Sequence, residues 1–135
     1  MNDSAKKLGS MKGNSLFDCL PETALLELVN HCRIETFASG QHLIEENGKN
    51  DSLFLITRGQ VKIIINSTHV GTQQAGETVG EISMLKISPP VADVIADGDV
   101  KALSFPTEII DAYCAHHPDF ATRLRATGMH KVYSR

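Results

Sequence analysis

The stretch Gly80-Glu81-Ile82-Ser83 combines residue types that can hold an anionic ligand. Glycine has no Cβ atom, so backbone at Gly80 can approach a ligand closely. The residues that follow fit one short helical turn, whose first amide N–H groups lack partners within the helix and can donate to a phosphate. Ser83 would add a hydroxyl donor, and the Glu81 carboxylate would accept hydrogen bonds from a sugar hydroxyl. The same spacing also fits an ordinary helix start, which an acid in the first turn stabilises.

Catalytic and metal-binding patterns are weak elsewhere in the chain. Cys19, Cys32 and Cys114 fall on apolar faces of predicted helices, where a cysteine usually acts as a small hydrophobic residue. Two histidines must converge on one ion in a cupin-type metal site, yet no predicted strand carries a His-x-His pattern. We therefore expect no catalytic residues, no bound metal and no enzymatic activity, with a cupin-like small-molecule or metal enzyme as the weaker alternative.

The composition is that of one ordinary globular domain. The chain has 135 residues, of which 41% are hydrophobic and 21% charged, and a formal net charge of -3. This charge gives no electrostatic reason to expect nucleic acid as a partner. No apolar run has the length of a membrane span, and no signal peptide is evident. An odd, unpatterned set of three cysteines fits a reduced protein, so we expect a cytoplasmic location and no membrane association.

The elements that must position the candidate site follow a simple order. Residues 1–14 are polar and Gly/Ser-rich, which predicts a flexible leader, and residues 15–135 form a single domain. Apolar residues at helical spacing after Pro21 predict a helix that ends near Cys32. From Arg33 to Phe105, short β-rich runs alternate with turn signals such as Arg58-Gly59 and Asp97-Gly98. The runs are RIETFA, HLIE, SLFLIT, VKIII, VADVIA and VKALSF.

Helical periodicity returns after the β-rich region. Ile109, Ile110 and Tyr113 fit one helix, and a second begins near Pro118. Phe120 and Leu124, four residues apart on the second helix, form an apolar stripe that a dimer contact could use. The pattern predicts a β-roll or barrel with helices near both ends, because rolling hides the edges of the sheet.

The order of these elements and several motifs resemble the cyclic-nucleotide-binding domain family. This family includes the sensor domain of the catabolite activator protein and the regulatory subunits of protein kinase A. The resemblance covers roughly residues 15–124. It depends on the positions of the glycines between the predicted strands, on Asp51 and on the Gly80-Glu81 pair. It implies a mainly β fold: an eight-stranded antiparallel β-roll with an N-terminal helix and C-terminal hinge and lid helices.

The resemblance also assigns the candidate ligand-binding residues, which are Gly80, Glu81, Ile82, Ser83, Pro90, Val91, Ala92 and Asp93. In the family this phosphate-binding cassette runs Phe-Gly-Glu, a small residue and leucines, then Pro-Arg-x-Ala-Thr/Ser-Val. The arginine that grips the cyclic phosphate falls on Pro90, and the Thr/Ser hydroxyl falls on Asp93. Loss of the cation, together with repulsion from Asp93, makes the cassette degenerate and disfavours an anionic ligand.

We therefore expect a non-catalytic regulatory or sensor domain that has no cofactor and binds cAMP or cGMP weakly. The alternative is a genuine cyclic-nucleotide sensor that uses helix N-terminal amides and Ser83. A separate effector protein is one possible partner, and a homodimer through the C-terminal helix is another. The basic tail, His130 to Arg135, either extends into solvent or supplies a group that fills the pocket.

Overall fold

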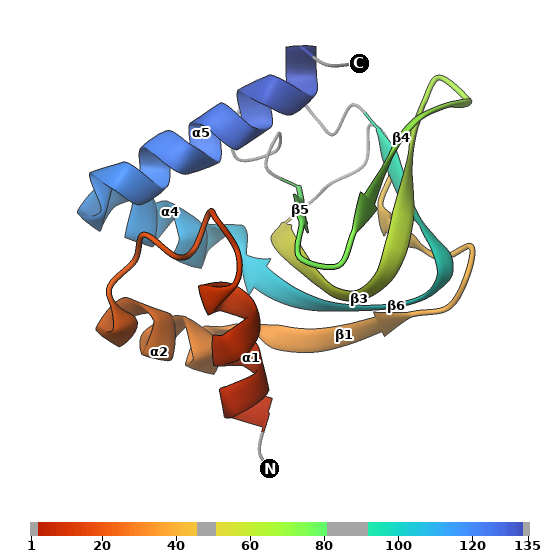
Figure 1. Ribbon diagram of the computed structural model, residues 1–135. Coiled ribbons are helices and arrows are strands. Elements are labelled where there is room, and N and C mark those ends of the chain that lie inside the picture. The colour runs from red at the N-terminus through yellow and green to blue at the C-terminus, as the bar shows by residue number, and fades with distance from the viewer. Residues whose placement is uncertain (1–2, 46–50, 81–91, 134–135) are drawn as a thin grey trace.

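The chain forms a rolled antiparallel sheet with helices packed against one side (Figure 1). The computed structural model describes residues 3–45, 51–80 and 92–133. Helices α1 (Asp3–Lys12) and α2 (Glu22–His31) precede the sheet, and α4 (Thr107–His116) and α5 (Pro118–Tyr133) follow it. The strands are β1 (Arg33–Phe37), β2 (His42–Ile44), β3 (Ser52–Ile65), β4 (Thr68–Gln74), β5 (Thr78–Val79) and β6 (Asp93–Pro106). The predicted mainly β fold with flanking helices is confirmed.

Two long strands, β3 and β6, run through the whole sheet. They pair antiparallel from Ser52 opposite Pro106 to Ile64 opposite Asp93. Strands β1 and β2 pair with β6, and strands β4 and β5 pair with β3. Each long strand has 14 residues and joins two runs that the sequence pattern predicts as separate strands. The described residues therefore contain six strands where we expected eight.

The difference arises at glycines that bend a strand without ending it. Gly59 has a φ of +87°, and a Cβ atom there would collide with the carbonyl oxygen of Asp99. The pairing of β3 with β6 shifts register on both sides of Arg58, as in a β-bulge. Gly98 also has a positive φ, 84°, within β6. Arg58-Gly59 and Asp97-Gly98, which we predicted to be turns, are corners that curl the sheet into a roll.

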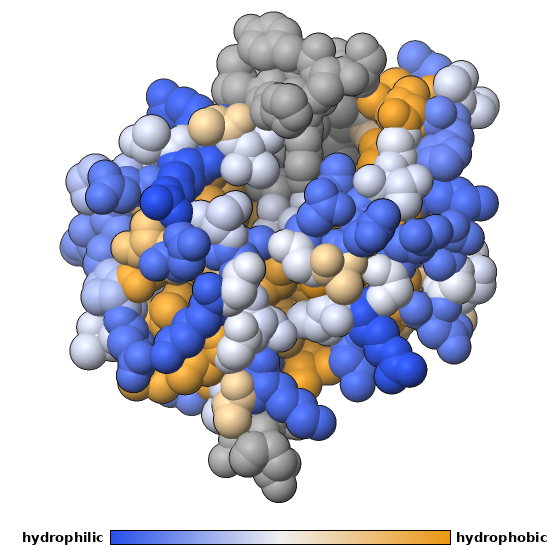
Figure 2. Space-filling model, in the orientation of Figure 1, coloured by the Kyte–Doolittle hydropathy of each residue, from blue (hydrophilic) through white to orange (hydrophobic). Residues whose placement is uncertain are grey.

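Alternation along β3 and β6 divides their side chains between two hydrophobic cores. The helix-side core lies between the sheet and the helices, and the roll core lies inside the roll. The helix-side core includes Met11, Leu16, Phe17, Leu20, Leu25, Leu28, Leu53, Leu55, Leu103, Phe105, Ile110, Phe120 and Leu124. The roll core contains Leu43, Ile44, Phe54, Ile56, Val61, Val79, Val94, Ala96, Val100 and Ala102. Hydrophilic residues cover most of the face shown in Figure 2.

The N-terminal segment is structured, which corrects the predicted flexible leader. Residues 3–12 form α1, whose Met11 is fully buried in the helix-side core. The Lys7 ammonium donates to the carbonyl of Cys32 at 2.9 Å, at the end of α2 where helix carbonyls lack partners. Met11 and the partly buried Leu8 are the large apolar residues with which α1 packs against this core, and two such positions are too few for the sequence pattern to indicate an amphipathic helix.

The apolar stripe on α5 packs inside its own chain. Phe120 and Leu124 are 0% and 4% exposed, so they are not available for the dimer contact that we suggested. The Arg123 guanidinium donates to the carbonyl of Ser15 at 2.6 Å and pairs with the Asp18 carboxylate. These contacts fix the beginning of α5 against the segment that follows α1. None of the described helices is long and apolar enough to cross a membrane.

Candidate ligand-binding site

The predicted site residues fall between the end of β5 and the start of β6. Gly80, directly after Val79, has a φ of 103°, a conformation that side chains other than glycine rarely adopt. Of the predicted site residues, the structure describes Gly80, Ala92 and Asp93. Glu81, Ile82, Ser83, Pro90 and Val91 lie outside the described residues, and their roles stay predictions. The positive φ of Gly80 explains why a glycine stands at this position directly after β5.

The strands on both sides of this segment present an apolar wall to the interior of the roll. Val79 and Val94 are buried, and both belong to the roll core. Phe54, which pairs with Val79 across β3 and β5, contacts Phe37 edge to face with the ring centres 6.0 Å apart. An apolar wall suits the ring of a small organic ligand, whereas its charged groups need polar partners from elsewhere. Hydrogen bonds or ion pairs to a phosphate would therefore have to come from other residues.

Asp93 lies on the outer face of the roll. Its neighbours Val94 and Ala96 are buried in the roll core, so alternation directs Asp93 and Ile95 the other way. The Asp93 Oδ1 atom is 3.6 Å from Nε2 of His42 on β2, and the pair is partly exposed to solvent. We expected this carboxylate to repel an anion inside the pocket. Its outward placement beside His42 removes the geometric basis for that repulsion.

Lys62 also lies on the outer face, where it pairs with Ile95 across β3 and β6. Its Nζ atom is 4.0 Å from the Asp97 carboxylate, which also accepts a hydrogen bond from the Gln60 amide at 2.7 Å. Val61 and Ile63, on either side of Lys62, face the interior. This lysine is therefore not placed to replace a phosphate-binding arginine within the roll.

A rolled antiparallel sheet between helices, with a positive-φ glycine directly after β5, is the arrangement that the sequence resemblance implies. Residues 34–117, more than half of the chain, match the family described as "Cyclic nucleotide-binding domain". The chain belongs to this family.

Among relatives, this cyclic nucleotide-binding domain is 26% identical over 95 residues to a cGMP-dependent protein kinase of Eimeria tenella, covering 70% of the chain and 10% of the relative. The domain spans between a tenth and a fifth of the length of such curated relatives.

Solved structures share its fold. The regulatory domain of Toxoplasma gondii PKA, crystallised with cAMP, aligns with a TM-score of 0.81 at 16% identity, over 93% of this chain and 50% of that one. A cAMP-bound mutant of the regulatory subunit of a cAMP-independent protein kinase A from Trypanosoma brucei aligns with a TM-score of 0.73 at 19% identity. The alignment covers 94% of this chain and 54% of that one.

Two long-range contacts of the domain, His42 with Asp93 and Asn14 with Gly76, were not predicted from the sequence. The pairing of His42 with Asp93 joins residues far apart in the chain, and only the β2–β6 register brings them together. Asn14 is buried and donates from Nδ2 to the carbonyl of Gly76 at 2.8 Å, in the turn before β5. Its Oδ1 atom accepts a hydrogen bond from the Leu16 amide at 2.8 Å, a local asparagine turn that a propensity argument could have found.

The cysteines of the domain lie in environments that suppress reactivity. Burial raises the pKa of the Cys19, Cys32 and Cys114 thiols, which disfavours the nucleophilic thiolate. All three are free and lie in or against the helix-side core. Within the described part of the chain, no group of three His, Cys, Asp or Glu side chains is arranged to hold a metal ion.

Proposed function

We propose that this cyclic nucleotide-binding domain is a non-catalytic regulatory module that binds cAMP and cGMP weakly. The observation that carries the proposal is Pro90, which stands where the family motif has its phosphate-gripping arginine. Proline has no side-chain donor and no backbone N–H, so it can donate no hydrogen bond to a phosphate. The suppressed cysteine thiols support a non-catalytic role.

The expected loss of affinity is large. Removing one partner of a buried, hydrogen-bonded charge pair costs about 2–5 kcal/mol, which corresponds to roughly 30- to several-thousand-fold in affinity. Backbone amides after Gly80 and the Ser83 hydroxyl remain as donors, but neither supplies a full positive charge. Because Asp93 faces outward, the proposal depends on Pro90 alone.

Titration of fluorescently labelled cAMP and cGMP into the purified domain tests the proposal. We expect dissociation constants well above the micromolar range for the natural sequence. Pro90→Arg should strengthen binding by at least about 30-fold. Asp93→Thr, a matched change in the same segment on the outer face, should change affinity by less than about threefold, since exposed charges are strongly screened. Micromolar binding by the natural sequence would contradict the proposal.

The alternative is a genuine sensor in which helix amides and Ser83 replace the arginine. The positive φ of Gly80 favours this alternative, because it is compatible with close approach of the backbone to a ligand. Ser83→Ala separates the two hypotheses: it should weaken binding about tenfold or more in such a sensor, because a hydrogen bond to a charged group is lost, and it should change the affinity little in a domain that binds weakly.

The domain would act by changing a partner, since the proposal leaves it no chemistry of its own. We propose a separate effector protein or further domain in the cytoplasm as that partner. A homodimer through α5 would have to use residues other than Phe120 and Leu124, which the helix-side core already buries.

A further inference from the structure

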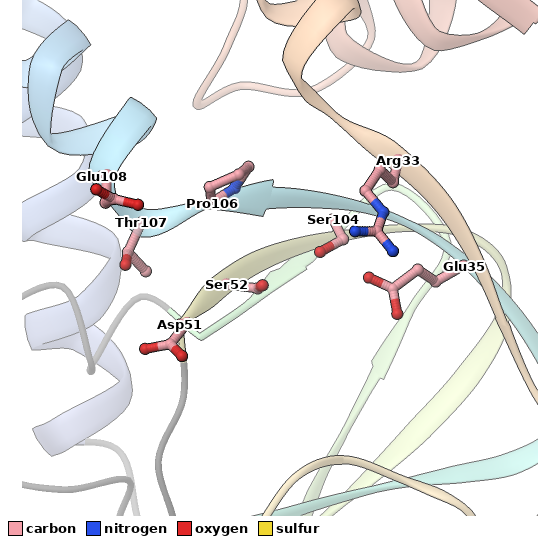
Figure 3. Close-up of a pocket in the computed structure, with 8 residues that line it drawn as sticks. All are labelled: Arg33, Glu35, Asp51, Ser52, Ser104, Pro106, Thr107 and Glu108. Atoms are coloured by element: carbon pink, nitrogen blue, oxygen red, sulfur yellow. The ribbon is translucent and has the colours of Figure 1, made fainter.

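A cleft lies between β1, the end of β6, the start of β3 and the first turn of α4 (Figure 3). Its volume is about 440 Å³, within the range of roughly 300–1,000 Å³ typical of small-molecule pockets. It is lined by Arg33, Glu35, Asp51, Ser52, Ser104, Pro106, Thr107 and Glu108. These residues are separate from the predicted cassette, so ligand binding in this cleft is independent of the proposed function.

Ser104 is the buried polar residue of this cleft. It is 5% exposed and lies between Arg33 on β1 and Phe54 on β3. Figure 3 shows its hydroxyl pointing into the space between Arg33 and Ser52. Within the described part of the chain, this hydroxyl makes no hydrogen bond to another protein group, and it is not sealed off from the cleft. A polar group of a ligand would therefore find a free donor and acceptor on the floor of the cleft.

The charges of the cleft determine which ligand fits. Three carboxylates, from Glu35, Asp51 and Glu108, outnumber one guanidinium, from Arg33. Arg33 and Glu35 are two residues apart on the same face of β1, so that end of the cleft carries one charge of each sign. Asp51 and Glu108 remain at the other end without a basic residue among those that line the cleft.

The walls of the acidic end are held together by the backbone. The Thr107 amide donates to the carbonyl of Asp51 at 2.9 Å, which joins the first turn of α4 to the start of β3. The pairing of Ser52 with Pro106 fixes the same two segments. Glu108 lies in the first turn of α4, and the Asp51 carbonyl accepts from the Thr107 amide of the same turn, so both acids lie at the helix end where the dipole stabilises carboxylates. The backbone segments that carry the two acids are therefore held together before any ligand arrives, which lowers the cost of binding.

We propose that this cleft binds a small organic cation that carries an ammonium or guanidinium group. The cationic group lies between the carboxylates of Asp51 and Glu108, and a second polar group of the ligand reaches the Ser104 hydroxyl. The limited volume favours a small molecule over a folded partner, and the excess of carboxylates disfavours anions.

The test uses agmatine, which has a guanidinium at one end and an ammonium at the other, titrated into the ¹⁵N-labelled domain at physiological salt. We expect saturable amide shifts at Ser52, Ser104 and Thr107, with a dissociation constant on the order of 1 mM. Asp51→Asn and Glu108→Gln should each weaken binding about tenfold or more, because each removes a charge-assisted contact. Ser104→Ala should weaken it about two- to tenfold, as for loss of one neutral hydrogen bond.

Asp99→Asn is the matched control, because it neutralises an exposed carboxylate outside this cleft. It should leave the agmatine affinity unchanged within about twofold. Glutarate, an anion of similar length, should cause no shifts at the same amides. The proposal is overturned if agmatine gives no saturable shifts, or if Asp99→Asn weakens binding as much as Asp51→Asn does. Saturation by a lysine-rich peptide but not by agmatine would also overturn it, in favour of a protein ligand.

Discussion

The helix-side core and the roll core are built from different side chains although β3 and β6 contribute to both. In the helix-side core, Phe17 stacks on Phe105 with ring centres 4.9 Å apart and lies 5.7 Å from Phe120. The roll core contains mostly valine, isoleucine and alanine, with Ala96 and Ala102 among its buried residues. Large interlocked rings resist repacking, whereas small side chains leave room along a concave wall. We infer that the helix-side core mainly stabilises the fold and the roll core mainly shapes the interior of the roll.

The largest expected effect tests this division directly. Phe17→Ala should lower the free energy of unfolding by about 3–5 kcal/mol, because it removes two ring contacts and leaves a cavity. Phe54→Ala, the matched change in the roll core, should cost about 1 kcal/mol less, because it removes one edge-to-face contact. Urea unfolding of both variants measures the difference. Equal losses would break the proposed division between the cores.

Asn14 joins the N-terminal helices to the sheet, since it connects the end of α1 with the turn before β5. Asn14→Ala should lower the free energy of unfolding by about 1–3 kcal/mol, because it leaves the Gly76 carbonyl and the Leu16 amide without their partner. Ser15→Ala, on the exposed neighbour, is the control and should have little effect. A loss of less than about 0.5 kcal/mol for Asn14→Ala would show that this link is replaceable by water.

Tyr113 provides a pH test of the helix-side region. Burial, followed by the hydrogen bond to Glu27, raises its pKa to about 12. The folded state therefore keeps this proton more tightly than the unfolded state, whose tyrosine titrates near its ordinary value of about 10. The stability that Tyr113 contributes is complete below about pH 10 and is lost as the pH rises towards about 12.

Ultraviolet titration of the folded domain checks this value. Tyr113→Phe should remove the late-titrating signal. Complete tyrosine titration of the natural sequence near pH 10 would contradict the prediction.

Cysteine labelling is expected to show the smallest effect. Iodoacetamide at pH 8 should modify Cys32 most slowly, because its side chain is 4% exposed and burial raises its pKa. Cys19 and Cys114, which are partly exposed, should react faster but still more slowly than in the urea-unfolded chain. Mass spectrometry of timed samples measures the three rates. Rapid labelling of Cys32 would indicate that the helix-side core opens readily.

The order of elements could be predicted from the sequence because hydrophobic period and turn residues are local signals. The helix near Leu25 and the alternation of Val61 with Lys62 are both confirmed. Strand continuity could not be predicted, since a positive-φ glycine looks the same whether it turns the chain or bends a strand. Gly59 is required by the approach of Asp99, a contact between distant segments.

The chemistry of the candidate site stays a prediction, and the structure describes part of its geometry. Gly80 has a positive φ, which a residue with a Cβ atom rarely adopts. The orientation of Asp93 follows from its register with Ile64 and from its pairing with His42, which depend on the folded sheet. A motif aligned on sequence gives the position of a side chain along a strand, but not the face on which that side chain lies.

The full-length pairing of β3 with β6 also has a kinetic consequence. The contact between Ser52 and Pro106 closes a long stretch of chain, and such non-local contacts form slowly compared with helices. Folding should therefore take milliseconds to seconds, with the closure of the roll among its later steps. A ligand that tied β5 to β6 would strengthen contacts formed late, so it would slow unfolding more than it would accelerate folding.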